Sequence, residues 1–150
     1  MERHITSLSR RIGWIVLAIT AWTAFVWVTR IVNLDEVDAA STVVWARIGI
    51  SLAFTAILLW IGFACVLQKL FAPRFAGYVL LAFGVWMAIS WLPEVVERFA
   101  ATDETVAFRA VHIGIALVSL GLGTAAATLG RKLIRGLIPD AAAHTAHASV

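Results

Sequence analysis

His112 is the one histidine inside an apolar stretch of this chain, and it is the residue best placed to do chemistry. An imidazole in such a position could ligate haem or a metal, or act as a pH switch. A haem held by two histidines needs a second buried histidine, but His4, His144 and His147 lie near the chain ends. We therefore expect a structural role, in which His112 hydrogen-bonds to a Glu or Asp of a neighbouring loop.

Other patterns of catalytic or metal-binding residues are missing from the sequence. The apolar stretches hold no carboxylate, and no Ser/His/Asp or Cys/His pairing, phosphate-binding loop or pair of acids is present at a plausible depth. His144 and His147 could bind a metal only weakly, because two ligands without a third make a poor site. We predict no catalytic residue, no metal site and no cofactor, and do not expect an enzyme.

Charged residues flank the apolar stretches, and some are expected to form an interfacial polar cluster. Glu94 and Arg98 have the i,i+4 spacing of a helical ion pair. The full expected cluster comprises Arg47, Glu94, Arg98, Arg109 and His112. Such a cluster can be a solvated rim, in which single pairs contribute little to stability, or a docking face for a partner.

The expected polar cluster must be positioned by the apolar parts of the chain. Four stretches contain no Asp, Glu, Lys or Arg: residues 12–29, 48–68, 75–92 and 110–130. Each has 18 or more residues, and about 20 are needed to cross a bilayer as a helix. The chain is 61% hydrophobic and 14% charged, and none of these stretches carries the polar stripe of a soluble helix. We predict an all-α integral membrane four-helix bundle.

The chain contains an internal repeat. Residues 13–27 and 77–91 align without a gap and share six of fifteen positions: Gly13/Gly77, Leu17/Leu81, Ala18/Ala82, Trp22/Trp86, Ala24/Ala88 and Trp27/Trp91. Residues 48–50 and 113–115 both read Ile-Gly-Ile, which places Arg47 opposite His112. The repeat predicts one membrane domain, residues 1–150, made of tandem hairpins at 12–67 and 75–133, related by a pseudo-twofold axis along the membrane normal.

The expected helices cover about residues 12–32, 46–68, 75–92 and 106–133. Pro93 suits a first helical turn, so residues 93–99 are expected to form a short amphipathic helix on the membrane surface. The candidate N-caps are Ser41 or Thr42 for the second long helix and Thr102 or Asp103 for the fourth. Residues 137–150 lack an apolar period and are expected to be disordered.

Small residues in the fourth stretch predict close packing of its helix against another helix. These residues are Gly114, Ser119, Gly121, Gly123 and Ala127. In lipid, small side chains let helix backbones approach closely. The pattern leaves open whether this face packs inside the monomer or against another chain.

Trp22 and Trp86 are a repeat-equivalent aromatic pair in the middle of the first and third stretches. The indole N–H of each needs a hydrogen-bond partner at that depth. The two rings can meet near the pseudo-twofold axis, or face lipid or another subunit. A cofactor or quinone between them is a further alternative, and stacked core is the default expectation.

Residues 80–86 read LLAFGVW, and Val111-His112, Val118-Ser119-Leu120 and Gly121 or Gly123 follow in the next stretch. With these motifs the second hairpin resembles a family of short two-helix integral membrane proteins from actinobacteria. The resemblance covers residues 74–136, about half of the chain, and implies topology and host group but no activity. The first hairpin departs from the pattern, since Arg47 stands where the family has a histidine.

The small-residue face, the charged rim and the missing active-site chemistry favour a non-catalytic subunit or accessory factor of a larger membrane complex. Its expected partners are the lipid bilayer and other membrane protein subunits, or copies of itself. A homo-oligomeric small channel or transporter is the alternative, and a cofactor-binding electron-transfer subunit centred on His112 is a third hypothesis. Binding of nucleic acid is not expected, because no basic patch with interleaved aromatic residues is present.

The basic residues predict the orientation in the cytoplasmic (inner) membrane. Eight basic residues are expected on one side of the membrane: Arg3, Arg10, Arg11, Lys69, Arg74, Arg131, Lys132 and Arg135. Four are expected on the other side: Arg30, Arg47, Arg98 and Arg109. Basic residues accumulate on the cytoplasmic side, so both termini are expected there. The first apolar stretch lacks a small-residue cleavage motif and is expected to be an uncleaved anchor.

This orientation predicts that a cysteine in the C-terminal tail is reached only from the cytoplasm. A Ser149→Cys variant should react with a membrane-impermeant maleimide in inverted vesicles and stay unlabelled in intact cells. The unsubstituted chain, whose single cysteine Cys65 lies in an apolar stretch, is the control. Labelling of Ser149→Cys from outside intact cells would reverse the orientation.

Overall fold

The computed structural model describes residues 2–67, 69, 72–100 and 105–136, and every regular element in these residues is a helix. The elements are α1 (Glu2–Val32), α2 (Glu36–Ala40), α3 (Thr42–Val66), α4 (Pro73–Ala100) and α5 (Val106–Ile134). Four of them contain segments long and apolar enough to cross a membrane, at Arg10–Val32, Thr42–Val66, Pro73–Ala100 and Val106–Ile134. The prediction of an all-α chain with four long apolar helices is confirmed, and the expected disordered tail at 137–150 lies outside the described residues.

Side-chain oxygens cap the starts of α3 and α5. Ser41 is the N-cap of α3, and its side chain accepts a hydrogen bond from the backbone N–H of Val44 at 3.4 Å. Ser41 is one of the two candidates predicted for this cap. At α5 the N-cap is Thr105, whose Oγ1 accepts from the N–H of Phe108 at 3.3 Å. The prediction of Thr102 or Asp103 as this cap is therefore wrong, because α5 begins at Val106 and both residues precede its cap.

Helix α4 continues through Pro93 to Ala100, so the expected separate surface helix at residues 93–99 is wrong. Proline has no N–H and cannot donate to the carbonyl of Ile89 one turn earlier. The adjacent carbonyl, that of Ser90, accepts a hydrogen bond from Nη2 of Arg47 on α3 at 2.6 Å. A neighbouring helix thus supplies a donor to the carbonyl next to the one that the proline leaves without its helical partner.

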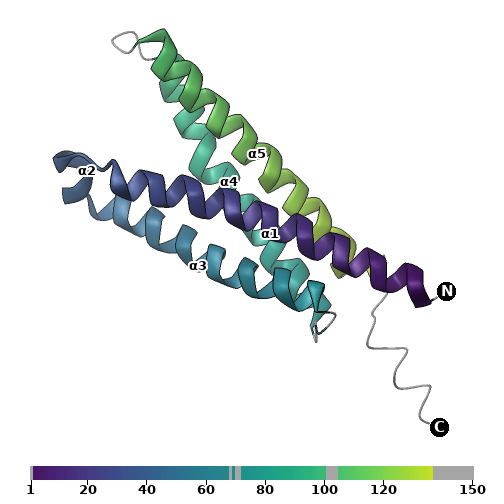
Figure 1. The fold of residues 1–150 in the computed structure, drawn as a ribbon. Coiled ribbons are helices and arrows are strands. Elements are labelled where there is room, and N and C mark those ends of the chain that lie inside the picture. The colour runs from purple at the N-terminus through teal and green to yellow at the C-terminus, as the bar shows by residue number, and fades with distance from the viewer. Residues whose placement is uncertain (1, 68, 70–71, 101–104, 137–150) are drawn as a thin grey trace.

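The long helices form two hairpins that cross each other (Figure 1). Helix α1 packs along α3, and α4 packs along α5, whereas the hairpins meet over shorter contacts of α3 with α4 and of α1 with α5. The hairpins diverge toward α2 on one side and toward the end of α4 and the start of α5 on the other. The crossing therefore leaves one end of the molecule more open than the other.

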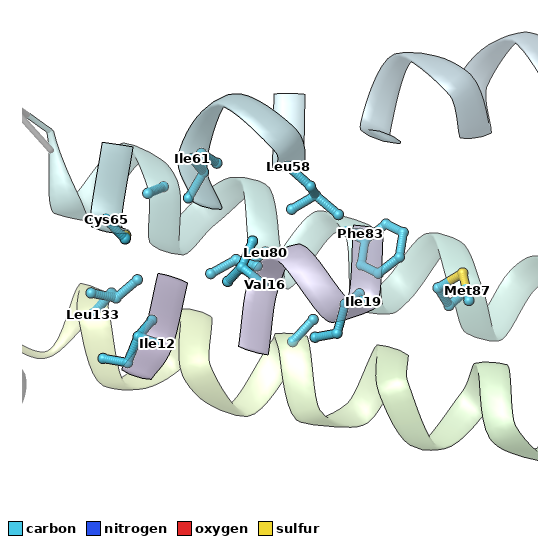
Figure 2. Close-up of a cluster of buried hydrophobic side chains, with 12 residues drawn as sticks. Ile12, Val16, Ile19, Leu58, Ile61, Cys65, Leu80, Phe83, Met87 and Leu133 are labelled. Carbon is cyan, nitrogen blue, oxygen red and sulfur yellow. The ribbon is translucent and has the colours of Figure 1, made fainter. Parts of the chain in front are cut away.

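Each of the four long helices contributes to one buried apolar cluster (Figure 2). Its largest members are Ile12, Val16 and Ile19 of α1, Leu58, Ile61 and Cys65 of α3, Leu80, Phe83 and Met87 of α4, and Leu133 of α5. Most of these residues belong to the first halves of α1 and α4 and the last halves of α3 and α5, and Ile19 and Met87 lie just past the midpoints of α1 and α4. The core thus lies at the end of the bundle opposite α2.

Glycines bring the backbones of α4 and α5 into direct contact. A Cβ atom added to Gly130 would lie 2.5 Å from the carbonyl oxygen of Gly77 and 2.9 Å from the nitrogen of Leu81. A Cβ added to Gly84 would lie 2.6 Å from the carbonyl oxygen of Gly123. Because these neighbours are backbone atoms, a larger side chain requires the helices to separate.

We expect Gly130→Ala to destabilise the hairpin that α4 and α5 form. The added methyl overlaps backbone atoms of α4, and overpacking of this kind costs about 1–3 kcal/mol. Gly114→Ala is the matched control, because it makes the same change on α5 at a position with no atom within 4 Å. Unfolding of both variants in mixed micelles, followed by circular dichroism, measures the difference, and equal stabilities would contradict the close packing.

Candidate functional site

A cleft of about 690 Å³ lies between the hairpins, at the end where they diverge. Every helix contributes to it. The lining residues are Val26, Trp27, Thr29, Arg30, Asn33, Asp35, Asp38, Val44, Arg47, Trp91, Glu94, Arg98, Phe108, Val111, His112 and Ile115. This inter-hairpin cleft brings six charged residues, three of them arginines, beside several aromatic ones.

Two tryptophans belong to the lining, Trp27 and Trp91, and Trp91 also packs against the core cluster. The ring centroids of Trp27 and Trp91 are 6.4 Å apart, and the rings are tilted by 50°. The Nε1 of Trp91 is buried and has no hydrogen-bond partner in the described structure, and the same is true of Oγ of the adjacent Ser90. A buried donor without an acceptor costs about 1–3 kcal/mol, so the Trp91 N–H is a polar group in need of a partner.

Ion pairs neutralise much of the charge that lines the cleft. Arg30 Nη2 lies 3.0 Å from Asp38 Oδ2, and Arg98 Nη2 lies 3.1 Å from Glu94 Oε1, the pair predicted from the i,i+4 spacing. Glu94 is 8% exposed, so its ion pair compensates for the burial of a carboxylate. Asp35 accepts from the N–H of Asp38 at 2.7 Å as the N-cap of α2.

Arg47 differs from the other two arginines of the cleft. Its Nη2 donates to the Ser90 carbonyl, and among the described residues no carboxylate lies within ion-pair distance of it. A guanidinium carries five N–H donors, and a single carbonyl uses one of them. Arg47 therefore brings a half-buried positive charge to the cleft, with donors to spare.

His112 bonds within its own helix. Its Nδ1 lies 2.9 Å from the carbonyl oxygen of Phe108, and the two rings are 4.0 Å apart. Among the described residues no Glu or Asp accepts the expected hydrogen bond from His112, and Asp103 and Glu104 lie outside those residues. With Nδ1–H donating to the carbonyl, the neutral ring leaves Nε2 as an acceptor.

The expected polar cluster is largely assembled, since Arg47, Glu94, Arg98 and His112 line one cleft. Arg109 lies outside this lining. The described residues contain no group of three or more His, Cys, Asp or Glu side chains that could hold a metal, and His144 and His147 lie outside the described residues.

Some residues of the cleft escaped the sequence analysis. The internal repeat aligns Trp27 with Trp91, as it aligns Trp22 with Trp86. An alignment alone does not indicate which of these pairs comes into contact in the folded chain. The pairing of Arg30 with Asp38 follows from the fold of the α1–α3 connection, which has no periodic pattern.

Trp22 and Trp86 do not stack on each other, and each forms a hydrogen bond to the other hairpin. Trp22 of α1 donates from Nε1 to Ser119 Oγ of α5 at 3.1 Å. Trp86 of α4 donates from Nε1 to Ser51 Oγ of α3 at 2.9 Å. Each tryptophan thus finds its partner on the second long helix of the other hairpin.

The expected small-residue face of α5 divides into two. Ser119 and Gly123 are buried, and Ala127 lies against Gly84 of α4. Gly114 and Gly121 point away from this packing, with no atom within 4 Å of an added Cβ. One set therefore packs inside the monomer, while the other is left on its surface.

The chain matches no protein-family model, no curated protein and no solved structure. The resemblance of residues 74–136 to short actinobacterial membrane proteins stays a prediction.

The bond between Trp22 and Ser119 should be measurable as a coupling energy. We expect Trp22→Phe and Ser119→Ala each to destabilise the protein, and their double-mutant cycle to give a coupling of about 0.5–1.5 kcal/mol. Trp60→Phe is the control, since Trp60 is 54% exposed and its indole makes no hydrogen bond in the described structure. Additive effects in micelle unfolding would show that the bond contributes nothing.

Proposed function

We propose that this chain is a multi-pass protein of the cytoplasmic membrane and a non-catalytic subunit or accessory factor of a larger membrane complex. The observation that carries the proposal is the surface of α5, where Gly114 and Gly121 stand free of the monomer's own packing. The proposal includes a tandem repeat of two hairpins and cytoplasmic termini, and excludes an active site.

The membrane placement is supported by the many apolar side chains that are exposed on the surface of the helix bundle. Only 22–33% of each apolar window is buried within the monomer. Large apolar residues such as Phe25, Trp60, Tyr78 and Val85 are more than half exposed. A soluble monomer rarely exposes so much contiguous apolar surface, whereas lipid solvates it.

The repeat is supported by contacts that recur in pairs. Gly13 abuts α3 as its counterpart Gly77 abuts α5. The contact of α3 with α4 has its counterpart in that of α5 with α1, as exchange of the hairpins about a twofold axis requires. Trp27 and Trp91, identical in the alignment, lie side by side, where such an axis would pass between them.

The exposed small residues of α5 support a partner helix. Gly114, Gly121 and Ala125 are all exposed, and their spacings of seven and four residues place them on one face. Lipid gives no reason for glycine on a helix surface, while a helix partner does, because small residues permit close backbone approach. We therefore assign the docking of a neighbouring subunit to this face of α5.

A channel is less well supported. Threonine hydroxyls inside the helices donate to carbonyls four residues earlier, as they do at Thr20, Thr23, Thr55, Thr124 and Thr128. Hydroxyls bonded in this way leave little polar lining for a path. The apolar cluster of Figure 2 lies across the end of the bundle opposite the cleft.

We expect the native protein, extracted in mild detergent, to migrate with other polypeptides, and Gly121→Leu to reduce their recovery at least about tenfold, a loss of about 1.4 kcal/mol. Ala82→Leu is the matched control, because it adds the same side chain at an exposed position of α4. Unchanged recovery in Gly121→Leu would refute the docking face. Steady ion conductance by the purified protein in bilayers would favour the channel instead.

A further inference from the structure

We propose that the inter-hairpin cleft is a binding site for a phospholipid with an anionic head group, whose phosphate oxygens lie on Arg47. The inference rests on the membrane placement proposed above, but it does not require a partner subunit on α5.

The first support is that Arg47 has no ion-pair partner in the described part of the chain. Arg30 and Arg98 are each paired with a carboxylate, and Asp35 caps α2, whereas the partner of Arg47 among the described residues is the neutral carbonyl of Ser90. Partial burial of a cation costs solvation free energy, and a nearby anion would offset this cost. Its planar fork of donors matches two oxygens of a phosphate.

The second support is the buried donor of Trp91. The indole N–H is a donor only, it is shielded from solvent, and no acceptor in the described structure reaches it. The Trp91 ring lines the same cleft as Arg47. A phosphate or ester oxygen of a bound lipid would supply the acceptor that the described residues do not.

The third support is the apolar part of the lining. Trp27, Val26, Val44 and Ile115 line the cleft together with the charged groups. A small hydrated anion gains nothing from such walls, whereas acyl chains bury apolar area against them. The volume of about 690 Å³ lies within the range of about 300–1,000 Å³ typical of ligand sites. The combination of a cation, a free donor and apolar walls fits an amphiphile.

His112 offers a second polar contact on the opposite hairpin. The sequence alignment places it opposite Arg47, and both residues line the cleft, one on α3 and the other on α5. Because Nδ1–H donates to the Phe108 carbonyl, Nε2 of the neutral ring is an acceptor, and it can accept a hydrogen bond from a hydroxyl of the head group but not from a phosphate oxygen.

The test is a titration of the purified full-length chain in detergent with phosphatidylglycerol and, separately, with phosphatidylcholine, followed by native mass spectrometry. We expect the unsubstituted protein to prefer phosphatidylglycerol. Arg47→Gln, which keeps a donor for the Ser90 carbonyl but removes the charge, should lower the affinity for phosphatidylglycerol about tenfold. Arg74→Gln, an exposed arginine at the start of α4, is the matched control and should bind normally.

A second variant guards against an effect of Arg47→Gln on folding. Trp91→Phe keeps the aromatic wall and removes an N–H that has no acceptor among the described residues, so lipid affinity should fall without loss of thermal stability in lipid-free detergent. Unchanged phosphatidylglycerol binding in both variants, or equal binding of the two lipids by the unsubstituted protein, would overturn the inference. Displacement of the lipid by millimolar inorganic phosphate would identify a site for soluble anions and overturn it as well. Loss of subunit recovery in Gly121→Leu with normal lipid binding would separate this site from the docking face.

Discussion

The arrangement of the molecule depends on where the hairpins cross. All four long helices bury apolar side chains together over one half of their length, around Val16, Leu58, Leu80 and Phe83. Within each hairpin the helices stay in contact, because glycines such as Gly84 and Gly130 let the backbones of α4 and α5 touch. Rigid hairpins that pack tightly at one end must separate at the other, and the inter-hairpin cleft is the consequence.

Hydrogen bonds fix how the hairpins sit on each other. Apolar packing alone is tolerant of small rotations, since dispersion contacts have no preferred direction. An indole N–H that must find a hydroxyl is less tolerant, and the bonds of Trp22 to Ser119 and Trp86 to Ser51 cross the interface in both directions. The hydroxyls of Thr20, Thr23 and Thr55 return to their own helices and exert no such control.

A proline couples helix geometry to the chemistry of the cleft. Pro93 lies inside α4, and the nearby Ser90 carbonyl takes a donor from Arg47 of α3. This bond holds the guanidinium of Arg47 in the lining that also contains Trp27 and Trp91. Among the described residues no carboxylate lies within ion-pair distance of this guanidinium, and the proposed lipid site depends on that.

The sequence determined the helices, because the number of consecutive uncharged apolar residues sets what can form a long helix in an apolar setting. It also predicted local contacts that depend only on spacing, such as the cap at Ser41 and the pair of Glu94 and Arg98. It did not predict that α4 would run through Pro93, or that Arg47, 46 residues earlier in the chain, would donate to the Ser90 carbonyl beside it. Nor could it decide whether Trp22 would meet Trp86 or a serine. Periodicity specifies which face of a helix is apolar, but the crossing of the hairpins decides what that face meets, and only the tertiary structure contains the crossing.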